Sequence, residues 1–183
     1  MGKLTVGSNP TPSAISTSKR RVIGDGMEVA SDTSPLSDHE LMGLAIEEAR
    51  IGSEQGEVPI GAVVVVDGKV IARRHNEREQ SQDPTSHAEL LAVRDAAAQL
   101  GSWRLENATV VVTLEPCAMC AGLMVNARVA RVVFGARSYE NGACGSLYQL
   151  GSDPRLNHEF ETVSDVRAAE CSELLSTYFA GLR

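Results

Sequence analysis

The amino-acid sequence predicts an α/β protein with a three-layer α/β/α architecture around a mixed five-stranded sheet. Helix-like and strand-like segments alternate along the chain in the order α-β-β-α-β-α-β-(β)-α. The first strand candidate, residues 60–66, is continuously apolar and β-branched, which is typical of a strand covered on both faces. With 183 residues, of which 43% are hydrophobic, the chain can bury the core of one domain, so wholesale disorder is excluded.

The predicted helices begin and end at recognisable signals. Ser37 and Glu40 form a capping box at the start of the first helix. Pro116 occupies a position that proline favours in the first turn of a helix. Glycines follow the first two helices, as expected at helix ends. We expect helices from 37 to between 52 and 56, from 85 to 101, from 117 to 125, and from about 165 to 182.

The predicted strands are separated by turn residues. Asp67-Gly68 lies between two strand candidates, residues 60–66 and 69–75, and is a strong signal for a tight hairpin. The later strands are expected at residues 108–113, 129–134 and 160–163. The folded domain is therefore predicted over residues 37–183.

Residues 1–36 differ from the rest of the chain. They are rich in Ser, Thr, Gly and Pro and have no apolar period. We predict that they form a disordered N-terminal tail.

The chain is acidic as a whole, with 17 Lys and Arg against 24 Asp and Glu and a formal net charge of −7. A negative total disfavours a nucleic-acid partner, yet phosphates are held by local basic patches and not by net charge. Scarce aromatic residues disfavour a long stacking platform for single strands. From charge alone, we interpret the basic clusters as solvated faces. These clusters are Arg73, Arg74 and Arg78 in one stretch, and Arg128, Arg131 and Arg137 in another.

The cysteine pattern and the apolar runs indicate the cellular compartment. Two of the four cysteines lie three residues apart, which does not resemble a secreted disulfide framework. No apolar run approaches the roughly twenty residues that a membrane helix needs. No signal peptide opens the sequence. We therefore expect a cytoplasmic protein without a membrane partner.

Two short segments carry side chains that bind metals. Cys117 and Cys120 lie three residues apart, so that on a helix both sulfur atoms face one side, near the dipole end that favours thiolates. His87 lies at the start of another helix, and two helices that begin at one sheet edge can direct their N-termini at a single point. Three protein ligands with a fourth position left for water are typical of catalytic zinc. Glu89 is then a spare carboxylate, and His87 should precede the first turn, because residues two apart do not share a helical face.

Each piece alone has a simpler interpretation. A Cys-x-x-Cys segment is often a structural zinc half-site or a redox pair, and a His-x-Glu segment is usually a coincidence at a helix start. A redox pair would leave His87 and Glu89 unexplained. The combination, each half on a helix after a buried strand, is the signature of zinc-dependent deaminases. A structural zinc site would need a fourth Cys or His ligand, and none of the remaining candidates has paired spacing. These candidates are Cys144, Cys171, His39, His75 and His158.

Longer stretches extend this pattern. With them, the chain from about residue 38 to residue 182 resembles the bacterial tRNA-specific adenosine deaminases. The resemblance implies a cytidine deaminase-like fold. The stretches are VPIGAV at 58–63, DPTSHAE at 83–89, TLEPCAMCAG at 113–122, FGAR at 134–137, GACGSL at 142–147, Asn157-His158, and the last helix from Cys171 to Phe179.

The resemblance implies hydrolytic deamination of adenosine to inosine at the wobble position of a tRNA anticodon. It implies one zinc ion per subunit, held by His87, Cys117 and Cys120, and Glu89 as the catalytic group that moves protons between water, the ring nitrogen and the departing ammonia. It also implies a homodimer and an arginine-tRNA anticodon stem-loop as substrate. The substrate-binding residues that it implies are Asn76 for the flipped nucleoside, Asn157 for the ribose, Tyr178 and Phe179 near the anticodon, and Arg73, Arg74 and Arg137 for flanking phosphates.

One departure from the family bears on the substrate. The chain has Ser138 where many relatives have an acidic residue, in a loop expected near the substrate.

Two alternative functions remain open. The first alternative is a zinc deaminase of a free base or nucleotide of guanine, cytosine or cytidine type. The second is a non-catalytic tRNA-binding subunit, which would not need Glu89.

Overall fold

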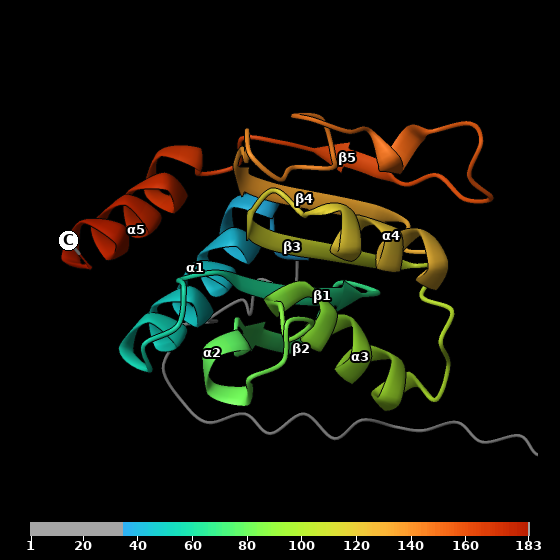
Figure 1. Cartoon of the computed structure of the whole chain (residues 1–183). Coiled ribbons are helices and arrows are strands. Elements are labelled where there is room, and N and C mark those ends of the chain that lie inside the picture. Colours follow the sequence, from blue (N-terminus) through green and yellow to red (C-terminus); the bar gives the residue numbers. More distant parts are fainter. Residues whose placement is uncertain (1–34, 183) are drawn as a thin grey trace, which may run out of the picture. The chain divides into compact units, whose positions relative to one another are not determined.

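The computed structural model describes residues 35–182 (Figure 1). The predicted tail at residues 1–36 lies outside the described residues except for Pro35 and Leu36, and so does Arg183 at the other end. The helices are α1 (Asp38–Glu54), α2 (Arg78–Ser81), α3 (Ala88–Leu100), α4 (Ala118–Ala127) and α5 (Ala168–Gly181), with a 3-10 helix η1 (Leu150–Ser152). The strands are β1 (Gly61–Val66), β2 (Lys69–His75), β3 (Ala108–Leu114), β4 (Arg131–Ala136) and β5 (Glu161–Val163).

The described strands form one mixed sheet with the order β2-β1-β3-β4-β5. Strand β1 pairs antiparallel with β2 and β3, whereas β4 pairs parallel with β3 and β5. Because β1 runs opposite to its neighbours, the start of β1 lies at the same edge of the sheet as the ends of β2, β3 and β4. This edge carries the candidate site.

Helices cover both faces of the sheet, which confirms the three-layer prediction (Figure 1). Alternate residues of a strand enter different cores: Val110 and Val112 pack with α3 and α4, whereas Val111 packs with α1 and α5. The central strands are therefore buried on both sides, as their continuous apolar sequence predicts.

Local signals account for the first half of the fold. Ser37 and Glu40 form the predicted capping box, since each backbone N–H reaches the other side chain. Asp67 and Gly68 have φ values of 49° and 73°, which is the backbone of a tight hairpin turn. A Cβ at Gly61 would lie 2.0 Å from the carbonyl oxygen of Ala45, so glycine lets α1 approach β1 closely.

Some helix and strand boundaries differ from the predictions. Helix α3 begins after His87 instead of at Thr85-Ser86, because the carboxylate of Asp83 accepts both the N–H and the hydroxyl of Thr85 and holds that residue in a turn. Helix α4 begins after Cys117, which places Pro116 before the helix and not in its first turn. Strand β4 lies two residues later than predicted, and the one-turn helix α2 was not predicted.

Candidate metal centre and active site

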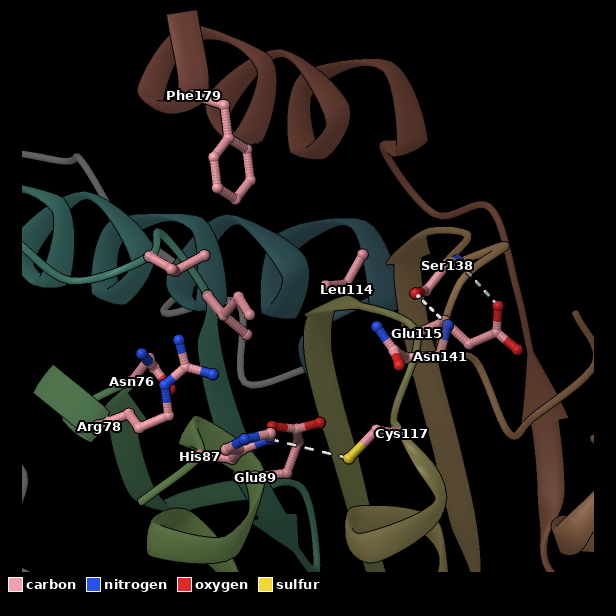
Figure 2. Close-up of a pocket in the computed structure, with 12 residues that line it drawn as sticks. Asn76, Arg78, His87, Glu89, Leu114, Glu115, Cys117, Ser138, Asn141 and Phe179 are labelled. Carbon is pink, nitrogen blue, oxygen red and sulfur yellow. Dashed lines mark hydrogen bonds between the residues drawn. The ribbon is translucent and has the colours of Figure 1, made fainter. Parts of the chain in front are cut away.

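Two helix starts bring the predicted metal ligands together. His87 is the N-cap of α3 and Cys117 is the N-cap of α4, and both have extended backbone. Cys120 follows in the first turn of α4. Since α3 and α4 begin at the same edge of the sheet, the three side chains converge there. Figure 2 shows two of them, His87 and Cys117.

The distances within this cluster fit a tetrahedral metal site. The Nδ1 atom of His87 lies 3.8 Å from Sγ of Cys117 and 3.7 Å from Sγ of Cys120. All three candidate ligand atoms lie within 4.8 Å of one another. Tetrahedral zinc with its usual bond lengths would place such sulfur and nitrogen atoms about 3.6 Å apart. The donor set and its spacing are therefore compatible with zinc.

The charges of the cluster also favour a cation. The Cys120 thiol donates to the Cys117 sulfur, and with His87 and the Cys120 backbone N–H it lowers the pKa of Cys117 to about 3. The same bond, burial and the nearby carboxylate of Glu89 raise the pKa of Cys120. The bond to Cys117 raises the pKa of His87. The lowered pKa of Cys117 favours its thiolate, and a divalent cation would stabilise both sulfurs as thiolates.

Glu89 lies beside this cluster. The residue is only 4% exposed, and its carboxyl group lies between His87 and Cys117 in Figure 2. Burial raises the pKa of Glu89, and this effect exceeds the opposing effects of its own backbone N–H and of His87. The order of residues at the helix start explains the placement: His87, before the first turn, and Glu89, within it, can reach the same space.

A cavity of about 430 Å³ opens over the cluster, within the range of small-ligand sites. Its apolar wall comes from the segment before β1, from the end of β3 and from α5. The lining residues are Val58, Ile60, Leu114 and Phe179 as the apolar wall, and Asn76, Arg78, His87, Glu89, Glu115, Cys117, Ser138 and Asn141 as the polar side.

Two of the predicted substrate-binding residues lie in this cavity. Asn76 directly follows β2 and is 4% exposed, and its side-chain amide donates to Glu57 over 2.9 Å. Phe179 points from α5 toward the cavity in Figure 2. Its ring meets that of Tyr178 edge-on, with the centroids 5.4 Å apart. Tyr178 itself is not among the lining residues, and its hydroxyl donates to the carbonyl of Gly56 over 3.0 Å.

The other predicted substrate-binding residues lie outside the lining of this cavity. Each of the three arginines makes an ion pair within the described part of the chain. Asn157 is exposed, and its carbonyl accepts from Arg128. The ion pairs are Arg73 with Glu47 and Glu48, Arg74 with Asp95 and Glu77, and Arg137 with Asp165.

Sequence reasoning missed several residues of the site. Glu115, which lines the cavity, and Glu57, which binds Asn76, are both almost fully buried. Arg78, named in the sequence only as a member of a basic cluster, also lines the cavity. The sequence did contain one indication of the two acids. Glu57 and Glu115 each lie next to a strongly apolar strand segment, where an exposed carboxylate is not expected.

Comparison with known proteins shows that this chain is similar to deaminases over most of its length. A family model described as MafB19-like deaminase matches residues 36–181. A tRNA-specific adenosine deaminase of Bacillus subtilis (strain 168) is 51% identical over 146 residues, covering 80% of this chain and 91% of that protein. A tRNA-specific adenosine deaminase of Haemophilus influenzae is 44% identical over 143 residues, covering 78% of this chain and 83% of that protein.

Two solved structures have a similar fold. One comes from biochemical and structural studies of A-to-I editing by tRNA:A34 deaminases at the wobble position of transfer RNA. It has a TM-score of 0.72 and 43% identity, and covers 74% of this chain and 99% of its own. A guanine deaminase from Bacillus subtilis has a TM-score of 0.55 and 29% identity, and covers 80% of this chain and 94% of its own.

Proposed function

This chain belongs to the tRNA-specific adenosine deaminases, with a MafB19-like deaminase domain at residues 36–181, and we propose that it converts the wobble adenosine of a tRNA anticodon to inosine. The observation that carries the chemistry is the buried carboxyl of Glu89 beside the His87–Cys117–Cys120 cluster. The choice of RNA over a free base is supported by 51% identity to a tRNA deaminase, against 29% to a guanine deaminase.

We propose that His87, Cys117 and Cys120 hold one zinc ion per subunit. A zinc ion in this position would supply Lewis-acid activation of water at neutral pH. The protein's own contribution is the fixed placement of two helix starts. The three ligand atoms already lie within 4.8 Å of one another, and the lowered pKa of Cys117 favours the thiolate that binds a cation.

Glu89 moves the protons of the reaction. It takes a proton from the attacking water as the oxygen bonds to C6 of adenine, and it delivers protons to the ring nitrogen and to the amino group. The bond between C6 and the amino nitrogen then breaks, and ammonia and inosine are the products. Burial of Glu89 limits exchange of this proton with bulk water.

The cavity suits one unstacked nucleoside. The base must leave its stack to reach the cluster, which costs little in a single-stranded anticodon loop. Ile60 and Leu114 offer apolar surface for the base, Asn76 offers its amide, and Phe179 stands at the mouth.

The phosphates next to the flipped nucleoside need cations. Arg78 is the nearest candidate, because it lines the mouth and its side chain is 47% exposed. Arg73, Arg74 and Arg137 remain proposed contacts for more distant phosphates, and each would have to leave a carboxylate partner to make them. Asn157 and Tyr178 also remain proposed contacts.

We further propose a homodimer through the face formed by α3 and α4. An apolar groove of about 250 Å³ lies there, and Trp103, which lines it, is 59% exposed. Met119 and Leu123 of α4 also reach the surface on this helix.

Among the described residues, no helix is both long and apolar enough to cross a bilayer. Free thiols at the metal site and a tRNA substrate support a cytoplasmic location.

The test is incubation of the purified, zinc-loaded protein with an arginine-tRNA anticodon stem-loop that has adenosine at the wobble position. Inosine at that position, measured by mass spectrometry of the digested RNA, is the expected product. Free adenosine, cytidine and guanine are run in parallel and should remain unchanged. Turnover of guanine with no inosine in the stem-loop would establish the free-base alternative instead.

A further inference from the structure

Glu57 is a buried carboxylate to which the proposed chemistry assigns no part. It lies between α1 and β1, is only 1% exposed, and is not among the residues that line the cavity. A carboxylate buried to this degree is costly unless hydrogen-bond donors compensate it. The hydrogen-bond donors that surround the Glu57 carboxylate therefore indicate its role.

Three donors reach the two oxygens of Glu57. The side-chain amide of Asn76 donates to Oε2 over 2.9 Å, and the backbone N–H of Glu79 donates to the same oxygen over 3.2 Å. The backbone N–H of Gln80 donates to Oε1 over 2.6 Å. Glu79 and Gln80 belong to α2, whose own N-cap residue makes no side-chain cap bond. Glu57 thus joins two neighbouring parts of the cavity wall.

The bond from Asn76 fixes the orientation of its carboxamide. The backbone N–H of Asn76 is already bound to the carbonyl of Ile60 over 2.9 Å, so the main chain is held as well. Rotation of the amide by half a turn would bring its oxygen against the carboxylate of Glu57, placing two acceptors together. Glu57 therefore determines which atoms of the Asn76 amide are available to a bound nucleoside.

We propose that Glu57 is a positioning residue for the deamination. It acts through Asn76, whose amide it locks in one orientation. This inference rests on the proposed function, because it assigns Asn76 to the flipped adenosine. The competing explanation is that Glu57 only stabilises α2 by accepting its N–H groups.

A double-mutant cycle separates the two explanations. Glu57→Gln keeps the shape of the side chain but supplies a donor that allows the Asn76 amide to turn around. We expect kcat/KM on the stem-loop to fall about 10- to 100-fold in Glu57→Gln. In an Asn76→Ala background the same change should cost less than about twofold, because the group through which Glu57 acts is gone. Independent losses that multiply would overturn the proposal.

Glu57→Gln should change kcat and not the affinity for the RNA. Affinity for the RNA comes mainly from phosphate contacts, so Glu57→Gln should leave the dissociation constant within about twofold of the wild-type value. The loss should appear in kcat. A loss confined to RNA affinity would contradict positioning of the reacting nucleoside.

Ile46→Val is the matched control for stability. Ile46 is buried in the core on the other face of the sheet, so shortening it weakens the fold without contact to Glu57 or Asn76. At a temperature well below unfolding, Ile46→Val should retain wild-type kcat. An equal loss of kcat in Ile46→Val and Glu57→Gln, at equal loss of thermal stability, would make the effect of Glu57 structural.

NMR spectroscopy tests, without any turnover, whether Glu57 fixes the orientation of the Asn76 amide. The side-chain amide signals of Asn76, identified by their loss in Asn76→Ala, should shift in Glu57→Gln and stay in place in Ile46→Val. If the wild type makes no inosine, the proposed function fails, and this measurement still decides whether Glu57 holds Asn76. If the wild type is active and the signals do not move, the positioning role fails alone.

A charge-swapped pair covers the case in which Glu57→Gln does not fold. Asn76→Asp places two carboxylates together and should lower the unfolding temperature. Adding Glu57→Gln to Asn76→Asp restores one donor and one acceptor, so the double variant should regain stability but not activity. If the second change restores no stability, Glu57 and Asn76 are not partners, and the proposal is overturned.

Discussion

The carboxylate of Glu115 accepts hydrogen bonds from both the backbone N–H of Ser146, over 2.9 Å, and the hydroxyl of the same residue. The backbone N–H groups of Ser138 and Cys144 also donate to it, over 3.0 and 3.1 Å. Burial by itself would raise the pKa of Glu115, but these donors together lower it. A Cβ at Gly142 would lie 2.4 Å from the carboxyl carbon, so the loop closes tightly around Glu115. One side chain thus anchors the loop that brings Ser138 and Asn141 to the cavity.

Replacing Glu115 should release this loop. Glu115→Gln places a donor against the N–H groups that the carboxylate now satisfies, and we expect a loss of about 1–3 kcal/mol in the free energy of unfolding. Limited proteolysis should cut residues 138–149 faster, and kcat/KM should fall. Ser146→Ala removes only one donor and is the control, with an expected cost of about 1 kcal/mol. Equal costs in the two variants would mean that Glu115 does not anchor the backbone of the loop.

Removal of the Glu89 carboxylate should separate catalysis from binding. We expect Glu89→Ala to retain zinc and RNA affinity and to lose deamination by about 10²- to 10⁴-fold, the usual contribution of a general acid–base group. Zinc is measured by elemental analysis, RNA binding by fluorescence anisotropy, and inosine by mass spectrometry. Glu106→Ala, at an exposed position, is the control and should behave as the wild type. Wild-type turnover by Glu89→Ala would overturn the assigned role.

The cysteines of the cluster should be required for zinc, and cysteines elsewhere should not. Cys117→Ala is expected to lose the ion and to unfold at a lower temperature, because a metal that binds only the folded state stabilises it. Cys171→Ala is the control, since Cys171 is also a free cysteine but is buried in the core on the other face of the sheet, away from the cluster. A chelator should lower the unfolding temperature of Cys171→Ala but not of Cys117→Ala. Stoichiometric zinc in Cys117→Ala would contradict the proposed ligand set.

Spacing along the chain made the clustering of His87, Cys117 and Cys120 predictable. The ligands belong to two helix starts, and each start has its own local signal: Cys117 and Cys120 share a helical face, and His87 precedes Glu89 by two residues. The sheet was predictable for the same reason, because its strands are marked by composition and by turns such as Asp67-Gly68. Local chemistry was therefore enough to predict the fold class and the residues of the cluster.

Contacts between distant segments were not predictable from spacing. The donors to Glu57 lie 19, 22 and 23 residues away, and those to Glu115 lie 23 to 31 residues away, so no local pattern relates them. The partners of Arg73 are likewise 25 and 26 residues away on α1. The family resemblance implied a phosphate contact for Arg73, but the fold gives Arg73 carboxylate partners. Only tertiary structure reveals which cations are already neutralised.

The exposed arginine at the cavity mouth should contribute more to RNA binding than Arg73. Arg78 lines the mouth and contacts only its neighbour Glu79 among the ion pairs of the described residues, whereas Arg73 binds both Glu47 and Glu48. We expect Arg78→Ala to weaken RNA binding and to reduce the slope of log K against log salt by about one. Arg73→Ala should reduce the slope by less, because Arg73 must first leave Glu47 and Glu48 to reach a phosphate. The reverse result would return the phosphate contact to Arg73.

The ion pair between Asp38 and Arg131 should make stability depend on pH. Two guanidinium nitrogens of Arg131 donate to the two carboxylate oxygens of Asp38, both over 2.7 Å, and join the start of α1 to the start of β4. The side-chain hydrogen bond from Arg131, helped by its charge and opposed by burial, lowers the pKa of Asp38. A carboxylate with a lowered pKa in the folded state stabilises the protein above its unfolded pKa, and this contribution disappears as the pH falls through the folded value.

We therefore expect the wild type to exceed Asp38→Asn in free energy of unfolding by about 1 kcal/mol at pH 7, and this difference to shrink once the pH falls below about 4. The difference stays modest because the pair is partly exposed and Arg131 also has Glu161 at 3.4 Å. Urea denaturation of both variants from pH 7 to pH 3 measures it, and subtraction removes the effects of other carboxylates and of zinc release, which both variants share. A difference that stayed constant over this range would show that the contact of Asp38 with Arg131 stabilises the fold by shape and not by charge.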